Sequence, residues 1–310
     1  MLKYILRRLG YSLVTLWLII TITFSLMHIL PGDPLGEGSE KLPQATKEML
    51  LKQYGLDKPM WEQYVTYIGK VAKGDLGFSY QFPAQKVTDI IKQSFPVSME
   101  LGLIALTLAI IVGLTLGTIA ALNHNKGLDY SASFIAVIGI SIPSFVLGPL
   151  LAYYFGVELK WLPVGLWLGP EYRVLPSIAL SFGTIAILTR MMRTSMLDVS
   201  SQDYIKTAKS KGLSKTSIVG RHMIRNAILP VITVLGPIFV SVITGTLVVE
   251  QIFAVPGLGK HFVKAVTSND YTMISGLTIF YSVLLIVVIF ITDVIYGLID
   301  PRIRLGKGGK

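Results

Sequence analysis

Long uninterrupted apolar stretches dominate the chain, and shorter polar segments separate them. A helix needs about 20 mostly apolar residues to cross the hydrocarbon core of a bilayer. Six stretches have that length, and they are Leu9–Leu30, Ser98–Leu122, Ser131–Val157, Val174–Met192, Ile228–Val249 and Ile274–Ile299. The pattern predicts an all-α integral membrane protein with six transmembrane helices, in which residues 1–310 form a single transmembrane domain.

The first apolar stretch follows Lys3, Arg7 and Arg8, as the apolar part of a signal peptide would. Its apolar run is longer than the roughly 7–15 residues of a signal sequence, and no small-residue cleavage site follows it. We therefore expect this stretch to be retained as the first span.

The composition agrees with a membrane protein. Hydrophobic residues make up 52% of the 310 residues and charged residues only 15%, whereas about 25% of an average soluble domain is charged. The absence of cysteine excludes a disulfide framework, a thiolate zinc site and a cysteine nucleophile. An ordinary soluble enzyme is excluded as well.

The net charge of +10 raises the question of a nucleic-acid partner, because basic chains bind polyanions. Sixteen of the 28 Lys and Arg residues, however, lie on the side of the membrane that holds both termini and the loops near 123–130 and 193–227, with only four acids. Cytoplasmic loops carry such an excess. The charge therefore predicts cytoplasmic N- and C-termini and no nucleic acid.

Two polar segments have an organisation of their own. Residues 31–97 are predicted to form an external, water-facing helical cap, with helices over Pro43–Leu56 and Pro59–Lys73 that Gly55 and Gly74 end. Residues 193–227 are predicted to form a basic cytoplasmic loop. Within it we expect a helix over Asp203–Lys211, a turn at Gly212, and a second helix that Ser214 caps and that ends at Pro230.

Proline and glycine mark interruptions and close contacts within the spans. Pro143 and Pro149 are expected to break the third span, and Gly236–Pro237 the fifth. Such breaks occur where the backbone lines a cavity or is covered by neighbouring helices. Gly113 and Gly117 form a small-xxx-small pair, which is typical of close helix packing.

The basic loop resembles the "EAA" loop of binding-protein-dependent ABC importer permeases, over residues 203–214 and then Arg221, His222 and Asn226. Lys206 stands where that family has glutamate, and Thr207 replaces the first alanine. In the family this loop is the coupling helix that docks into a cytoplasmic ATPase. The resemblance implies an ATPase-coupling role for Asp203, Tyr204, Ala208, Lys209, Gly212, Leu213, Arg221 and His222.

Further segments resemble the B-type subunit of the peptide/nickel branch of these permeases. They occur in order along nearly the whole chain, and they are Leu30–Pro34, Gly74–Gly77, Pro96–Leu101, Ser141–Phe145, Val249–Phe253, Pro256–Gly259, Asp293–Tyr296 and Asp300–Arg302. The resemblance implies the type I ABC importer permease fold and the inner membrane of a bacterial cell.

The function implied by the resemblance is that of a permease subunit that forms half of a translocation pathway for oligopeptides or dipeptides. A second homologous permease, two cytoplasmic ABC ATPases and an external binding protein would be its partners, besides membrane lipid. No Gly-x-x-x-x-Gly-Lys-Ser/Thr loop occurs in the chain. ATP and Mg²⁺ are therefore expected at the ATPases, with no enzyme activity and no cofactor on this chain.

Other candidate positions lie in or near the spans. Four small polar residues on the broken helices could line the pathway, although isolated Ser and Thr in spans often bond their own backbone; they are Ser141, Ser144, Ser241 and Thr244. A gate or a brace at the outer mouth is expected at Glu250, Phe253, Pro256, Gly257 and Gly259. Glu100 and Asp293 are acids near span ends, for which pairing at the interface is the favoured interpretation.

Three alternatives remain at this point. Nickel is the second cargo of the branch, and Met27–His28 would be one site for it, although no metal site is expected. An ion-coupled secondary transporter would need midplane carboxylates and repeats. An intramembrane hydrolase would need a Ser/His or metal constellation in the spans, where His28 is the only histidine.

Overall fold

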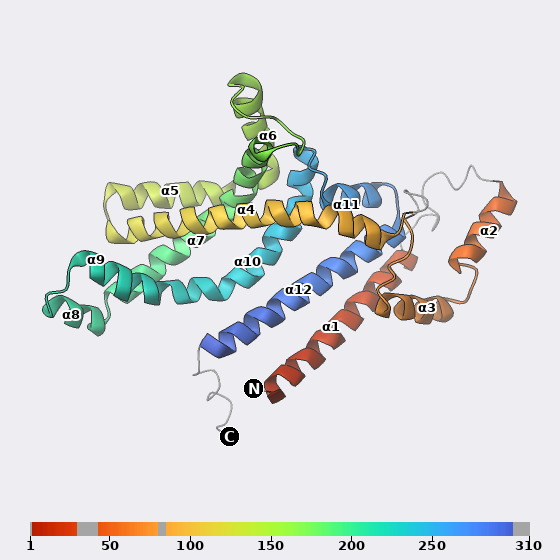
Figure 1. Ribbon diagram of the computed structural model, residues 1–310, viewed down its shortest axis with the longest axis horizontal. Coiled ribbons are helices and arrows are strands. Elements are labelled where there is room, and N and C mark those ends of the chain that lie inside the picture. The colour runs from red at the N-terminus through yellow and green to blue at the C-terminus, as the bar shows by residue number, and fades with distance from the viewer. Residues whose placement is uncertain (1, 30–42, 80–84, 300–310) are drawn as a thin grey trace. The chain divides into compact units, whose positions relative to one another are not determined.

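The computed structural model describes residues 2–29, 43–79 and 85–299 (Figure 1). Regular structure within these ranges is helical, apart from an isolated β-bridge between Phe78 and Lys86. The chain divides into two compact units, one made of Met1–Pro96 with Gly257–Lys310 and the other of Val97–Pro256. We call them the first and second units and describe each by itself.

The first unit contains both ends of the chain. Its helices are α1 (Leu2–Ile29), α2 (Gln44–Tyr54), α3 (Met60–Ala72), the beginning of α4 (Val87–Leu122), α11 (Leu258–Thr267) and α12 (Tyr271–Ile299). Helices α1 and α12 lie side by side and antiparallel (Figure 1). The beginning of α1 and the end of α12 therefore lie at the same end of this unit.

The polar segment after α1 folds as two helices, as its pattern predicts. Helix α2 ends at Gly55, which has a left-handed backbone (φ +72°), and Pro59 immediately precedes α3. Gly74 (φ +76°) and Gly77 (φ +83°) then turn the chain toward α4. Both helix predictions are confirmed. The segment Leu30–Pro34 lies outside the described residues.

A buried polar contact fastens the start of α12. The Ser79 hydroxyl donates to Asp270 Oδ2 (2.5 Å), and Oδ1 of Asp270 accepts the backbone N–H of Met273 (3.0 Å). Asp270 is fully buried. The chain at Ser79 thus packs on the beginning of α12.

The second unit is built around α7, which packs against α5, α6 and α10. Its elements after α4 are α5 (Gly127–Ser141), α6 (Ser144–Leu151), the π-helix η2 (Ala152–Glu158), the 3-10 turn η3 (Pro170–Arg173), α7 (Val174–Ser200), α8 (Asp203–Ser210), α9 (Lys215–Ser217), the π-helix η4 (Ile218–Ile224) and α10 (Arg225–Ile252).

Within the described residues, five helices are long and apolar enough to cross a bilayer, and a bent helix pair brings the number to the predicted six if it counts as one span. This pair, Gly127–Ser141 with Ser144–Glu158, bends by 104° at Ile142 and Pro143. The prediction of a break at Pro143 is therefore correct.

The other proline interruptions are wrong. Pro149 lies inside α6, and Gly236–Pro237 lies inside α10, which continues without interruption. Pro230 also lies inside α10, so the second helix of the basic loop runs directly into the fifth span. One proline removes a single backbone hydrogen bond, and packing of α10 along α7 offsets that loss.

Helix α4 begins earlier than its apolar run predicts. It starts at Val87 and passes through Pro96, because Val87, Ile90 and Ile91 are buried in the core of the first unit. Farther along, the Gly113/Gly117 pair lets α4 approach α7 closely, as its spacing predicts. A Cβ added at Gly117 would lie 2.6 Å from Thr189 O and 2.7 Å from Met192 Cβ.

Candidate functional site

The polar loop after α7 folds as its capping residues predict. Asp203 begins α8, where a negative charge is favourable, and its carboxylate accepts from Lys206 Nζ (2.8 Å). After α8, Gly212 has φ +74° and open space around it. The Ser214 hydroxyl then accepts the backbone N–H of Ser217 (3.3 Å) and caps the next helix. Gly212 is therefore required for its conformation and not for its small volume.

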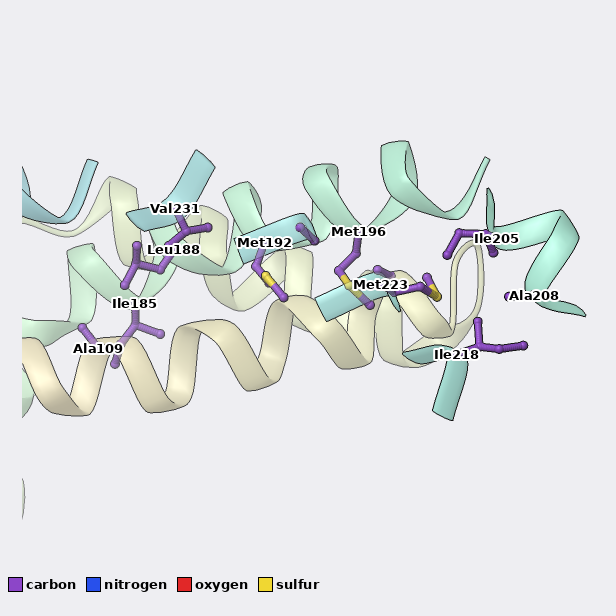
Figure 2. Close-up of a cluster of buried hydrophobic side chains, with 12 residues drawn as sticks. Ala109, Ile185, Leu188, Met192, Met196, Ile205, Ala208, Ile218, Met223 and Val231 are labelled. Atoms are coloured by element: carbon purple, nitrogen blue, oxygen red, sulfur yellow. The ribbon is translucent and has the colours of Figure 1, made fainter. Parts of the chain in front are cut away.

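One face of α8 is buried against the membrane part of the unit. Ile205 and Ala208, one helical turn apart, join the apolar cluster that Met196 and Met223 continue (Figure 2). The cluster runs back along α7 through Met192 to Leu188. Ala208, an expected ATPase-coupling residue, thus anchors α8 and presents no surface of its own.

The other residues of α8 and those just after it are exposed, and they carry both charged and apolar groups. On α8, Tyr204 is 43% exposed, and Asp203 and Lys209 are exposed as well; Leu213, after the helix, is 41% exposed. Large apolar side chains on a polar loop are typical of a contact surface, and tyrosine is enriched where such contacts carry most of the binding energy. The exposed side of the loop therefore offers both apolar and charged groups.

An open depression of about 750 Å³ lies on the following helix. Its lining residues are Gly220, Arg221, His222, Arg225 and Asn226. The Asn226 amide donates to His222 O (2.6 Å), which fixes its orientation. Arg221 and His222 were expected here. Arg225 was not, although its spacing of four residues from Arg221 places both on one helix face.

An ion pair ties the start of α5 to α7. Asp129, whose side chain is 2% exposed, accepts from Arg193 Nε (2.5 Å) and Nη2 (2.8 Å), and from the backbone N–H of Asn125 (3.0 Å). A ring nitrogen of His124 lies 3.3 Å from the same carboxylate. Bidentate Arg–carboxylate pairs are geometrically specific. Sequence reasoning missed this site because the partners are 64 residues apart.

Two of the four expected pathway residues bond the backbone of their own helices. The hydroxyls of Ser141 and Thr244 donate to carbonyls of their own helices, Val137 O (2.8 Å) and Val240 O (2.9 Å). Ser144 begins α6 beyond the bend, and Ser241 is exposed on α10. For Ser141 and Thr244, the backbone-bonding alternative is thus the observed one.

Of the expected outer residues, Glu250 and Phe253 are fully buried. The Phe253 carbonyl accepts the backbone N–H of Leu166 (2.8 Å), and a Cβ at Gly165 would lie 2.9 Å from that oxygen. The loop between η2 and η3 therefore closes over the end of α10. This contact braces Phe253 within the second unit.

The remaining outer residues form a turn. Pro256 is exposed, Gly257 precedes α11, and Gly259 is buried near the start of that helix. Burial lowers the pKa of His261 on α11, and the neighbouring Lys260 and Lys264 lower it further. His261 is therefore neutral near pH 7.

Glu100 forms the pair that its position near a span end suggests. Its Oε1 lies 3.1 Å from Arg173 Nη1, and the Arg173 guanidinium stacks over the Trp167 ring at 5.4 Å. The interpretation of Glu100 as a paired residue is confirmed. The side chain of Asp293 lies outside the description.

His28, the possible nickel ligand, has both ring nitrogens next to protein oxygens. Nδ1 lies 2.8 Å from Phe24 O, and Nε2 lies 3.1 Å from Gln63 Oε1. Within the described residues, no group of three or more His, Asp and Glu side chains is arranged to hold a metal ion.

Within the described residues, five or six apolar crossings and a polar loop packed on them define a multi-pass membrane protein. Residues 113–305 match the family described as the binding-protein-dependent transport system inner membrane component, and residues 1–102 match its N-terminal family. The chain belongs to this family. It is a transport permease subunit and a multi-pass protein of the bacterial inner membrane.

Full-length relatives carry more specific names. The chain is 46% identical to the dipeptide transport system permease protein DppB of Bacillus subtilis over 309 residues, which cover 100% of both chains. It is 42% identical to the oligopeptide transport system permease protein OppB of Salmonella typhimurium, over 98% of this chain and 100% of that protein.

Solved structures share the fold. An amino acid ABC transporter crystallised with histidines aligns with a TM-score of 0.51 at 17% identity, over 69% of this chain and 94% of that one. The MetNI methionine ABC transporter in inward-facing conformations aligns with a TM-score of 0.58 at 16% identity, over 69% and 97%. The expected ABC importer permease fold is confirmed.

Proposed function

We propose that this chain is the permease subunit of an ATP-driven importer that takes up dipeptides or oligopeptides delivered by an external binding protein. The observation that carries the proposal is the full-length identity of 42–46% with permeases named for dipeptide and oligopeptide transport. A second homologous permease completes the pathway, and two ATPases with bound ATP and Mg²⁺ supply the energy.

In the proposed orientation, both termini and the loop 193–227 are cytoplasmic. The excess of Lys and Arg in these segments supports it, and the antiparallel α1 and α12 agree with termini on one side. Residues 31–97 are then external, where the binding protein docks. Glu250, Phe253 and the Pro256–Gly259 turn brace the outer mouth, with Phe253 held by the loop at Leu166.

The coupling step follows from the anchoring of α8. ATP binding draws the two ATPases together, and the exposed side of the loop, with Tyr204 on α8 and Leu213 after it, moves with them. Ile205 and Ala208 transmit this movement because they pack on η4 and belong to the apolar cluster that continues along α7. Arg221, Arg225 and His222 add a cationic surface beside α8 that suits acidic groups of the ATPase.

The coupling role is tested by Gly212→Val. A β-branched residue is strained at φ +74°, so the turn after α8 should shift while α7 and the spans remain intact. In reconstituted transporter, we expect peptide uptake to fall at least tenfold, and ATP hydrolysis to lose its stimulation by binding protein and peptide. Gly127→Val is the matched control, since Gly127 also has open space but no left-handed backbone.

The cargo is tested in the same proteoliposomes with a labelled dipeptide, a labelled tetrapeptide and radioactive nickel. Uptake of either peptide, dependent on ATP and on the binding protein, is the expected result. Transport by this chain alone without ATP would refute the importer, and uptake of nickel alone would refute the peptide cargo.

A further inference from the structure

The outward face of α3 carries large apolar side chains that the interpretation of 31–97 as a water-facing cap does not explain. Met60 is 59% exposed, Trp61 69% and Val65 62%. Trp61 and Val65 are four residues apart, so they share one helix face. Three such side chains in the first two turns of one helix form an apolar patch, which we call the α3 patch.

The other face of α3 is fixed to α1. The hydroxyls of Tyr64 and Thr21 are 2.6 Å apart, and Gln63 Oε1 lies 3.1 Å from His28 Nε2. The Phe24 ring packs edge-on against Tyr64, with centroids 5.3 Å apart. These contacts hold α3 against the last third of α1.

This attachment sets the depth of α3 in the membrane. Thr21 lies eight residues before Ile29, the end of a 25-residue apolar span. At 1.5 Å per residue, Thr21 is about 12 Å along the helix axis from that end. Because Tyr64 reaches Thr21, α3 lies beside the outer part of the span and does not stand above it.

The α1 surface at the same depth is also apolar. Leu18, Ile22 and Leu26 are 46–56% exposed, as expected of side chains that face lipid. Tryptophan favours the membrane–water interface, where its ring is partly buried in the headgroup region. Lys70 and Lys73, both exposed near the end of α3, can reach headgroup phosphates.

We propose that α3 is an interfacial helix whose Met60, Trp61 and Val65 side chains contact the lipid of the leaflet at the C-terminal end of α1. Leu18, Ile22 and Leu26 on α1 are exposed at the same depth, so lipid as a single occupant accounts for both exposed apolar surfaces. The external segment 31–97 is then partly embedded in the outer leaflet. The binding protein contacts the parts of this segment that lie outside the lipid.

The test uses the whole transporter complex in nanodiscs. Trp61 emission is obtained as the difference between the wild-type protein and Trp61→Phe, so that other tryptophans cancel. Lipids brominated near the headgroup should quench this emission strongly, and water-soluble acrylamide should quench it weakly. A conservative Trp→Phe change retains an aromatic ring, and uptake by the variant checks that it is folded.

Two outcomes would overturn the proposal. Strong acrylamide quenching without bromolipid quenching would place Trp61 in water. Quenching or a spectral shift that occurs only when the binding protein is added would make the α3 patch a protein-docking surface. Neither outcome bears on peptide transport itself, which the uptake assay measures independently.

Discussion

The contact between α4 and α7 can be tested by adding one methyl group. In Gly117→Ala, the new Cβ would lie 2.6 Å from Thr189 O and 2.7 Å from Met192 Cβ, well inside ordinary contact distance. Backbone and Cβ atoms cannot rotate away, so the two helices must separate by several tenths of an ångström. Overpacking of this kind lowers the stability of a protein by about 1–3 kcal/mol. The higher helix propensity of alanine offsets up to about 1 kcal/mol of this loss.

We therefore expect Gly117→Ala to destabilise the protein by about 1–2 kcal/mol. A domain of 150–250 residues loses about 2–4 °C in melting temperature per kcal/mol, so a decrease of several degrees is measurable by thermal unfolding of the transporter in nanodiscs. Gly10→Ala is the matched control, because a Cβ at Gly10, also in a helix, meets nothing within 4 Å. If both variants melt at the wild-type temperature, the close contact between α4 and α7 is refuted.

Three further predictions concern other contacts. Ile205→Ala should cost about 2–4 kcal/mol of packing and release α8, so hydrogen exchange over residues 203–210 should accelerate; unchanged exchange would contradict the anchoring. Asp129→Asn should lower the free energy of unfolding by about 2–3 kcal/mol. The loss is smaller than for a fully buried pair, because the Arg193 side chain is 26% exposed. Adding Arg193→Gln in a double-mutant cycle should restore part of the lost stability. The pKa of His261 is lowered on folding, so its contribution to stability is complete above about pH 6.5 and declines as the pH falls toward the folded-state pKa. His261→Gln should flatten the curve of stability against pH in this range. An unchanged curve would refute the role of His261.

Features set by local physics could be predicted from the sequence. Apolar length gave the six spans, and the capping residues of α8 gave its bounds to within one residue, because both depend on neighbours in the chain. Gly212 was identified from its position after a helix, where the left-handed backbone that it adopts is common. The bend at Pro143 belongs to the same group.

Features set by tertiary contacts could not be predicted. Pro96, Pro230 and Pro237 have the same local effect as Pro143, yet the helices pass through them. Whether a proline ends a helix depends on the packing that remains on either side of it. The partners of Glu100 and Asp129 lie 73 and 64 residues away in the sequence, and nothing in one sequence pairs residues at such separations.

Helix α8 illustrates why local prediction and tertiary packing are both needed. An isolated helix of eight residues is not stable in water. Forming the first turn of a helix is unfavourable, and a helix shorter than about 12–15 residues does not gain enough hydrogen bonds to offset that cost. Helix α8 therefore owes its stability to Ile205 and Ala208, which bury one face against the end of α7 and η4. A partner cannot displace α8 without either breaking this packing or moving α7 with it. Since this apolar cluster continues along α7 toward α4, we expect a displacement of α8 to be transmitted to the spans.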